Sequence, residues 1–443
     1  MEIKQFYDEN LAHASYAVLS EGNIALIDPG RNPQQYYDYA KAKSATIVAV
    51  IETHPHADFI SSHLEISNTT GAKIYVSRLA GALYDNVPFD EGDELKLGKI
   101  NLVSINTPGH SPDSICILIK DENNNDYAIA TGDTLLVGDV GRPDLRESAG
   151  SISKSKEDLA RMMYNTINEK LMPLPEDLLV YPAHGAGSLC GKSTSTDTFT
   201  SIGKEKNENY AFQKMSEQKF VNELLSEQSF VPKYFSYDVE LNRKGAPDFK
   251  KSIKNVNRID SYVQVEPGSP VIDSRDRKDF INGHFKGAIN LMQDKKFETW
   301  LGSIISPDEK FYIVADSSDK LENIIERIAK IGYEVNIKGA LIHKNTEGLV
   351  KSETADVDYF KKHTEDFTIV DVRNKSEVEK KKIFSKSISI PLPEIRERYK
   401  EIPLEKPLMI HCAAGLRSAA ASSILSNLLP VKVFDLGENI KSF

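Results

Sequence analysis

Short apolar runs separated by turns make up most of the first half of the chain. Val, Ile and Leu are frequent in these runs, and each run ends close to Gly, Pro or a polar residue, which is the pattern of β-strands. The runs that we interpret as strands are Ile24–Asp28, Thr46–Ile51, Ile100–Ile105, Tyr127–Ala130 and Leu178–Tyr181. Lys156–Leu171 carries apolar residues at helical spacing and predicts an amphipathic helix. We therefore expect this half to be rich in strands, with helices between them.

The last third of the chain contains an internal repeat. Val271–Leu291 is similar to Ile369–Leu392, and in each copy an Asp-x-Arg triplet closes the first apolar run. A second apolar run and a helical pattern follow in each copy, at Phe311–Val314 and 321–331 and at Leu408–His411 and 417–428. Strand–loop–helix units of this size favour two small α/β domains with parallel sheets.

Length and charge narrow the class of protein. A chain of 443 residues corresponds to about three domains, which we predict at 1–245, 256–347 and 355–443. The net charge of −10 argues against binding to nucleic acid or to an anionic membrane. No secretory signal is visible in MEIKQFYDEN and no apolar run is long enough to span a membrane, so we expect a cytoplasmic protein.

The three cysteines have to be explained one at a time, because they are too few for a disulfide framework or a zinc module. Cys116 lies in the apolar run SICILI, which indicates core packing. Cys190 lies shortly after His184, and two interpretations stay open: a secondary redox or sulfur-relay thiol, or a small buried hydrophobic residue. Cys412 follows a predicted strand and is the candidate nucleophile considered below.

Polar side chains follow four predicted strands at the point where each strand ends. The cluster His54-Pro-His-Ala-Asp58 follows one strand, and His110, Asp133 and His184 each follow another. Loops at the ends of strands are favoured places for active sites, because a rigid sheet can direct several of them to one point. A single His after a strand is weak evidence, but four such strand ends together indicate a metal centre.

These segments, THPHADF, PGHS, TGD and PAHG, resemble the motifs of the metallo-β-lactamase superfamily. The resemblance covers residues 1–245 and implies a four-layer αββα sandwich, followed here by the two α/β domains. In the binuclear hydrolases of this superfamily a second-site His follows the residue that corresponds to Asp58. This chain has Phe59 there, and because Phe cannot bind a metal, a complete second site is disfavoured.

Within the superfamily the domain is most similar to the persulfide dioxygenases, a similarity that LAHASY, IDPGR and GDVGRPDL also carry. The resemblance implies one Fe(II) per chain, held by His54, His110 and Asp133. Two His and one carboxylate with open positions suit a mononuclear iron centre that activates O₂. Zinc, which has no redox chemistry, would not support such a reaction.

The same resemblance implies roles for the polar residues around the ligands. His56, Asp58 and His184 would orient the ligands and bound water. Arg142 lies in the segment GRPD just beyond Asp133, and two interpretations stay open. Its guanidinium either binds the carboxylate of a thiol cofactor or forms a structural pair with Asp144.

The segment around Cys412 has the pattern of an anion-binding loop. It follows a strand and opens a helix, so that backbone N–H groups and the helix dipole point into the loop and favour a thiolate. Gly415 permits an unusual backbone conformation, and Arg417 adds a fixed positive charge. The loop shares its pattern with the loop of some phosphatases but is shorter. It resembles the loop of the rhodanese sulfurtransferases. The resemblance implies that Cys412 carries sulfur and that Gly415, Arg417 and Ser418 surround the substrate.

The first repeat lacks the nucleophile and the arginine of this loop. Asp316 stands at the position of the nucleophile and Leu321 at the position of the arginine. Residues 258–347 thus resemble a rhodanese fold without its nucleophile, which implies a spacer or docking domain.

The order of domains resembles the fusion proteins that detoxify sulfide-derived persulfides. Our hypothesis is that O₂ oxidises the persulfide of a low-molecular-weight thiol to sulfite at the iron, and that Cys412 transfers sulfane sulfur to sulfite, giving thiosulfate. One alternative is a zinc-dependent thioester hydrolase of the glyoxalase II type with an accessory sulfurtransferase, and another is a non-catalytic persulfide carrier or sensor. The thiol (glutathione, coenzyme A or bacillithiol), the route of sulfur to Cys412 and assembly into a homo-oligomer are left open.

Overall fold

The computed structural model describes residues 1–146, 154–192, 194–226, 228–260, 264–344 and 348–443. The chain divides into two compact units, Met1–Lys251 with Ala329–Gly332, and Ser252–Ile328 with Tyr333–Phe443. Each unit is described by itself. The three domain ranges that we expect from the sequence stay predictions, and the end of the second range, 345–347, lies outside the described residues.

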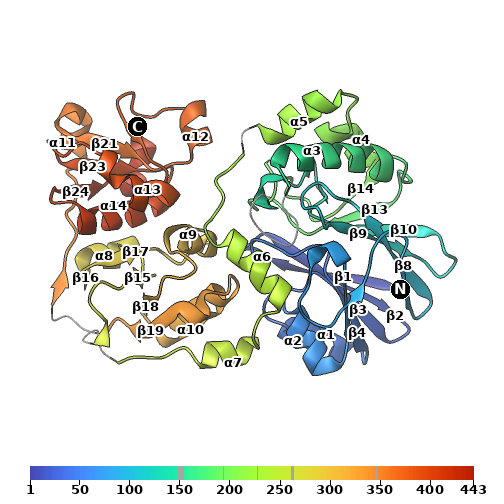
Figure 1. Ribbon diagram of the computed structural model, residues 1–443. Helices are drawn as coiled ribbons and strands as arrows, with labels where there is room; N and C mark the ends of the chain where they lie inside the picture. The colour runs from blue at the N-terminus through green and yellow to red at the C-terminus, as the bar shows by residue number, and fades with distance from the viewer. Residues whose placement is uncertain (147–153, 193, 227, 261–263, 345–347) are drawn as a thin grey trace. The chain divides into compact units, whose positions relative to one another are not determined.

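Two six-stranded sheets form the centre of the first unit (Figure 1). One sheet has its strands in chain order: β1 (Glu2–Asp8), β2 (His13–Ser20), β3 (Asn23–Ile27), β4 (Thr46–Ile51), β5 (Lys73–Val76) and β6 (Val87–Pro88). The other has the order β14 (Thr200–Ser201), β13 (Leu179–Pro182), β10 (Asp126–Gly132), β9 (Ile115–Lys120), β8 (Ile100–Asn106) and β7 (Glu94–Leu97). A short hairpin, β11 (Leu135–Leu136) and β12 (Asp139–Val140), follows β10.

Helices cover the outer face of each of these sheets. On the first sheet lie α1 (Gln34–Ala42) and α2 (His63–Thr70); on the second lie α3 (Lys156–Asn165), α4 (Ile202–Glu208) and α5 (Glu217–Leu225). A π-helical turn, Thr166–Leu171, continues α3. Neighbouring residues of one strand enter different layers: Val18 packs between the two sheets, whereas Ala17 packs under the helices. Both faces of these strands are buried, which explains their almost uninterrupted apolar runs. The unit is the expected four-layer αββα sandwich.

The helix α6 (Phe235–Lys244) completes this part of the chain, and α7 (Phe249–Lys254) begins in the first unit and ends in the second. None of the helices in the described ranges is both long enough and apolar enough to cross a membrane.

The second unit contains two parallel four-stranded sheets. The first has the order β17 (Ala288–Asn290), β15 (Val271–Asp273), β18 (Phe311–Ala315) and β19 (Ile337–Ile342); the second has the order β22 (Ile388–Ser389), β21 (Thr368–Asp371), β23 (Leu408–His411) and β24 (Val433–Asp435). The helices are α8 (Arg277–Asn282), α9 (Phe297–Ile304) and α10 (Ser318–Ala329) around the first sheet, and α11 (Val357–Lys362), α12 (Lys375–Lys380), α13 (Ile395–Arg398) and α14 (Leu416–Leu428) around the second. A two-stranded ribbon joins β16 (His284–Phe285) to β20 (Leu349–Val350). The parallel sheets confirm the expected α/β class.

The internal repeat is reproduced at the level of single hydrogen bonds. At the end of β15, Arg275 Nε donates to Asp273 Oδ1 over 2.9 Å, and at the end of β21 Arg373 Nε donates to Asp371 Oδ1 over the same distance. All four side chains are buried. The Asp-x-Arg triplet is therefore a structural clamp that closes the loop after the first strand of each copy.

Candidate metal centre and sulfur-transfer loop

Three of the predicted residues bring their polar atoms together at the edge of the sandwich. His54 follows β4, His110 follows β8 and Asp133 follows β10. Asp133 Oδ2 lies 3.8 Å from His54 Nε2 and 3.6 Å from His110 Nε2. All three side chains are buried, and Asp133 Oδ2 has no hydrogen-bond partner among the residues that the structure describes. A buried carboxylate oxygen without a donor that faces two imidazole nitrogens fits a metal cation.

The other oxygen of Asp133 is held by His184. His184 Nδ1 lies 2.6 Å from Asp133 Oδ1, and its Nε2 lies 2.9 Å from Asp58 Oδ2. Burial by itself lowers the pKa of His184, but the two carboxylates outweigh it and hold that pKa well above the usual value. In turn, and against the effect of burial, His184 holds the pKa of Asp133 well below its usual value. His184 thus binds one oxygen of Asp133 and favours its ionised form, while Asp58 binds the other nitrogen of His184; the orienting role that we expect for both stays a prediction.

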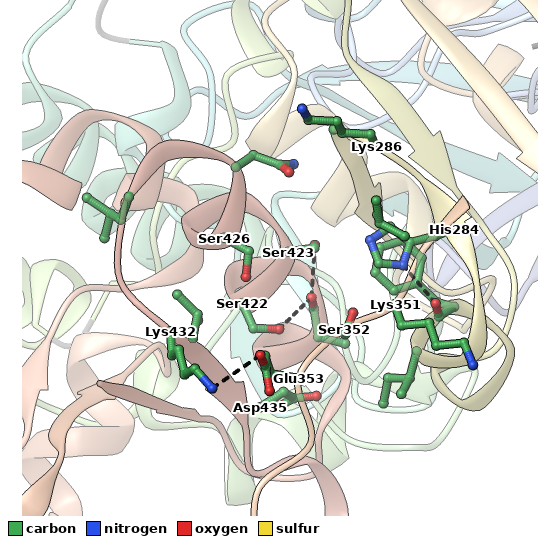
Figure 2. A pocket seen from close by; sticks show the side chains of 18 of the residues that line it. His284, Lys286, Lys351, Ser352, Glu353, Ser422, Ser423, Ser426, Lys432 and Asp435 are labelled. Atoms are coloured by element: carbon green, nitrogen blue, oxygen red, sulfur yellow. Dashed lines mark hydrogen bonds and ion pairs between the residues drawn. The ribbon is translucent and has the colours of Figure 1, made fainter. Parts of the chain in front are cut away.

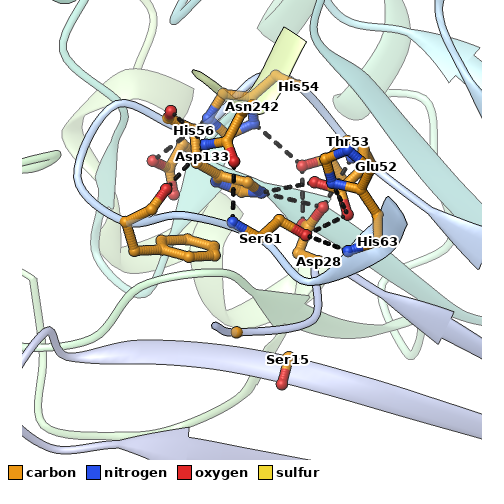
Figure 3. Close-up of polar contacts among 12 residues, drawn as sticks. Ser15, Asp28, Glu52, Thr53, His54, His56, Ser61, His63, Asp133 and Asn242 are labelled. Atoms are coloured by element: carbon orange, nitrogen blue, oxygen red, sulfur yellow. Dashed lines mark hydrogen bonds and ion pairs between the residues drawn. The ribbon is translucent and has the colours of Figure 1, made fainter. Parts of the chain in front are cut away.

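His56 contacts a different pair of carboxylates, those of Asp28 and Glu52. Its Nε2 lies 3.1 Å from Asp28 Oδ1 and 3.9 Å from Glu52 Oε2 (Figure 3). Asp28 also accepts the Thr53 hydroxyl over 2.8 Å, and the Thr53 oxygen lies 3.0 Å from His54 Nδ1. Because the Thr53 proton goes to Asp28, His54 Nδ1–H donates to Thr53, which leaves the lone pair of His54 Nε2 for a metal. His56 thus acts on the site through Asp28 and Thr53.

Sequence reasoning missed several residues of this network. Asp28 ends the predicted strand Ile24–Asp28 and lies in the segment IDPGR, which signalled a family resemblance but not a contact with His56. Burial raises the pKa of Glu52 to about 8, and Ser61 donates to it over 2.7 Å. Asn242, on α6, donates to the carbonyl oxygens of His56 and Phe59. No local signal marks Asn242, because its partners lie far away in the sequence.

Phe59 fills the place next to Asp58 with an aromatic ring. The ring is buried and lies 3.8 Å from the His13 ring and 4.3 Å from the His56 ring, measured between centroids. Cys190 lies close to Asp58 and His184, and the ligand atoms of the three residues lie within 4.8 Å of one another. Burial raises the pKa of Cys190. The thiol therefore lies beside the candidate metal centre, where burial favours its protonated form.

Arg142 has the second of the two arrangements that the sequence left open. Its Nε and one terminal nitrogen each donate to Asp144 over 2.6 Å, and the guanidinium also contacts the carbonyl oxygens of Leu189 and Ser229. The side chain is 1% exposed. The guanidinium fork is occupied by protein oxygens, so we assign Arg142 a structural part and propose no substrate contact for it.

Gly141 allows the loop after β12 to pass close to the ligands. A Cβ atom at this position would lie 2.0 Å from the Asp133 carbonyl oxygen and 2.8 Å from His110 Nδ1. We expect Gly141→Ala to displace both ligand residues and to reduce bound metal more than about tenfold, as loss of ligand support does elsewhere. Metal content per chain measures the effect, with circular dichroism to check folding. Gly30→Ala is the control, because its Cβ would meet only ordinary contacts at 3.7 Å; equal metal content in both variants would contradict the assignment.

The loop after β23 wraps around the sulfur of Cys412. Gly415 has a φ of 100°, and its N–H donates to Cys412 Sγ over 3.1 Å. Ser418 Oγ lies 3.7 Å from the same sulfur and donates to the Gly415 carbonyl over 3.1 Å. A Cβ on Gly415 would lie 3.0 Å from the carbonyl carbon of Gly437, so glycine is required for space as well as for φ. The structure therefore brings Cys412, Gly415 and Ser418 together.

Arg417 has partners that the sequence did not reveal. Glu377, on α12, accepts two hydrogen bonds from its guanidinium, one of them 2.8 Å long. The Trp300 ring, on α9 of the first repeat, lies 5.7 Å from the guanidinium carbon. The only local signal for Glu377 was its place three residues after Asn374, which marks a helix start. In the first repeat Asp316 pairs with Lys320, and no thiol is present there.

A groove of about 590 Å³ lies between α8 and α14 in the second unit (Figure 2). Two of the cations that line it are paired, Arg277 with Asp435 and Lys432 with Glu353. Cys412 is not among the lining residues. The groove is therefore separate from the transfer loop.

Comparison with known proteins agrees with the descriptions of the αββα sandwich and of the C-terminal α/β domain. Residues 9–184 match the model of the metallo-β-lactamase superfamily, and residues 356–442 match the model of the rhodanese-like domain. Similar curated proteins include the probable metallo-hydrolase YqgX of Bacillus subtilis, 31% identical over 39% of this chain and 84% of that protein. The human mitochondrial persulfide dioxygenase ETHE1 is 34% identical over 31% of this chain and 49% of that enzyme.

One solved structure is similar over much more of the chain. It is a metallo-β-lactamase from Staphylococcus aureus, 29% identical, with a TM-score of 0.69 over 77% of this chain and 99% of that one. The chain spans about half the length of the human dioxygenase that it matches and almost all of the staphylococcal protein.

Proposed function

Because the chain belongs to the metallo-β-lactamase superfamily and ends in a rhodanese-like domain, we propose an iron-dependent dioxygenase acting on the persulfide of a low-molecular-weight thiol, with sulfur transfer at Cys412. The observation that supports this most directly is the ligand set. Two imidazoles and one carboxylate face a single point, and Phe59 fills the neighbouring position. Such a set with open positions suits Fe(II) better than a pair of zinc ions.

The residues of the chain prepare this centre for one metal ion. Fe(II) bound by His54, His110 and Asp133 would supply the redox chemistry by which O₂ oxidises the persulfide sulfur to sulfite. His184 holds Asp133 ionised, and Thr53 fixes the tautomer of His54. These buried partners keep the three ligand atoms in place before substrate arrives.

The second step is sulfur transfer at Cys412. The Cys412 thiolate attacks the outer sulfur of R–S–SH, the S–S bond of the donor breaks, and RS⁻ leaves, so that Cys412 carries the outer sulfur as a persulfide. The sulfur of sulfite then attacks this outer sulfur, which gives thiosulfate and restores the thiolate. The Gly415 N–H and the start of α14 stabilise the negative charge on Cys412 in both steps.

Metal replacement combined with an oxygen electrode tests the proposal. We expect the purified protein to hold about one iron per chain, because the described residues contain one set of two imidazoles and a carboxylate. It should consume O₂ only when glutathione persulfide is present. Removal of the metal with a chelator should stop O₂ uptake, and Fe(II) but not Zn²⁺ should restore it. A zinc protein that hydrolyses thioesters without O₂ would indicate the hydrolase instead, and a protein that binds no metal would indicate a carrier.

A further inference from the structure

The guanidinium of Arg417 is held from two sides. The Glu377 carboxylate accepts from both terminal nitrogens, and the Trp300 ring lies 5.7 Å from the guanidinium carbon. The Arg417 side chain is 12% exposed and that of Glu377 is 35% exposed. Although burial opposes it, Arg417 lowers the pKa of Glu377, so the carboxylate is ionised. The donor fork of Arg417 is therefore occupied by a charge of opposite sign.

The charged groups at the end of β21, the strand that pairs with β23 just before Cys412, are balanced in the same way. Arg373 is bound by Asp371 and by the Lys381 carbonyl oxygen. Burial lowers the pKa of His411, which is neutral at pH 7. Among these neighbours each arginine is thus compensated by one carboxylate. What attracts an anion to Cys412 is the Gly415 N–H, which donates to Cys412 Sγ, together with Arg417, which interacts with Cys412 and is shared with Glu377.

The two kinds of substrate place different demands on Arg417. An organic persulfide presents a single sulfur with at most one negative charge, which the Gly415 N–H at Cys412 can stabilise. Sulfite and thiosulfate are dianions, and their paired oxygens match a guanidinium fork, just as a carboxylate does. A sulfur oxyanion and Glu377 therefore compete for the same donors.

From this competition we propose that Glu377 is a specificity-determining residue that weakens the binding of sulfite and thiosulfate at Cys412 and leaves loading by organic persulfides unhindered. The inference rests on the proposed sulfur transfer at Cys412. Loading of Cys412 by thiosulfate is the reverse of sulfite attack on the loaded Cys412, so one transition state serves both directions, and Glu377 acts on both. Cys412 then receives its sulfane sulfur from the organic persulfide rather than from thiosulfate, the product of the transfer.

The variant Glu377→Gln separates the charge of this side chain from its shape. Glutamine still accepts a hydrogen bond from Arg417 but removes the competing charge. We expect the KM for thiosulfate to fall about tenfold, the scale of one ion pair in a half-buried place. The kcat/KM for glutathione persulfide should change less than about twofold, because that donor does not need the fork. Both are measured as thiocyanate formed from cyanide, with the uncatalysed rate subtracted.

Glu401→Gln is the matched control. It removes a carboxylate from an ion pair of the same domain, with Arg398, that is more exposed, and we expect neither constant to change. An unchanged or higher KM for thiosulfate in Glu377→Gln, or a parallel change for both donors, would show that Glu377 only positions Arg417 and would overturn the inference. Failure of the proposed function gives a different result, since Cys412→Ser would then still transfer sulfur.

Discussion

Replacement of His110 by Ala is expected to abolish persulfide-dependent O₂ uptake. His110 Nε2 is, with His54 Nε2, one of the two imidazole nitrogens that face Asp133 Oδ2 in the described part of the chain. Without it the metal would have two protein ligands, and loss of the metal would leave the buried carboxylate without its balancing cation. We expect iron per chain and O₂ uptake to fall more than about hundredfold, beyond what loss of a supporting partner costs. Metal analysis and an oxygen electrode on the same preparation measure both.

The transfer activity of the same variant provides its control. Cys412 belongs to the second unit and His110 to the first, so His110→Ala should still pass sulfur from glutathione persulfide to cyanide at the wild-type rate. That result would show that the variant is folded and that only the oxidation is lost. A variant that keeps its iron and its O₂ uptake would exclude His110 as a ligand.

The reciprocal variant, Cys412→Ser, is expected to lose sulfur transfer and to keep O₂ uptake. A serine oxygen fits the loop and can still accept from the Gly415 N–H, but it cannot carry sulfane sulfur as a persulfide. The oxidised product should then remain sulfite, and thiosulfate should fall to the uncatalysed level. Chromatographic measurement of both ions during O₂ uptake tests this expectation. An unchanged ratio of sulfite to thiosulfate would contradict the coupling of the two activities.

Much of the fold follows from local patterns in the sequence. The run Thr46–Ile51 is β4 to the residue, and the predicted helix Lys156–Leu171 spans α3 and its π-helical end. These predictions succeed because strands that are buried on both faces must be apolar throughout, and because loop residues such as Gly and Pro mark where the strands stop. The repeat was visible for the same reason, since its Asp-x-Arg clamp is made by residues two apart.

The arrangement of the three ligand residues was predictable from the sequence only in part. The order of strands brings His54, His110 and Asp133 to the same edge, so their convergence was predictable once each was seen to follow a strand. How the oxygens of Asp133 are divided was not predictable. One oxygen faces the two ligand imidazoles and the other faces His184, and only three-dimensional geometry decides which neighbour each lone pair meets.

By itself, then, the sequence determined the class of fold, the positions of the strand ends and the thiol at the start of α14, because each depends on residues that are near one another in the chain. The tertiary structure decided which partner each charged or polar side chain has. It paired Arg142 with Asp144, placed Cys190 beside Asp58 and set Glu377 against Arg417. Such choices depend on contacts between segments far apart in sequence, where burial makes an unpaired charge costly and the nearest opposite charge is therefore taken.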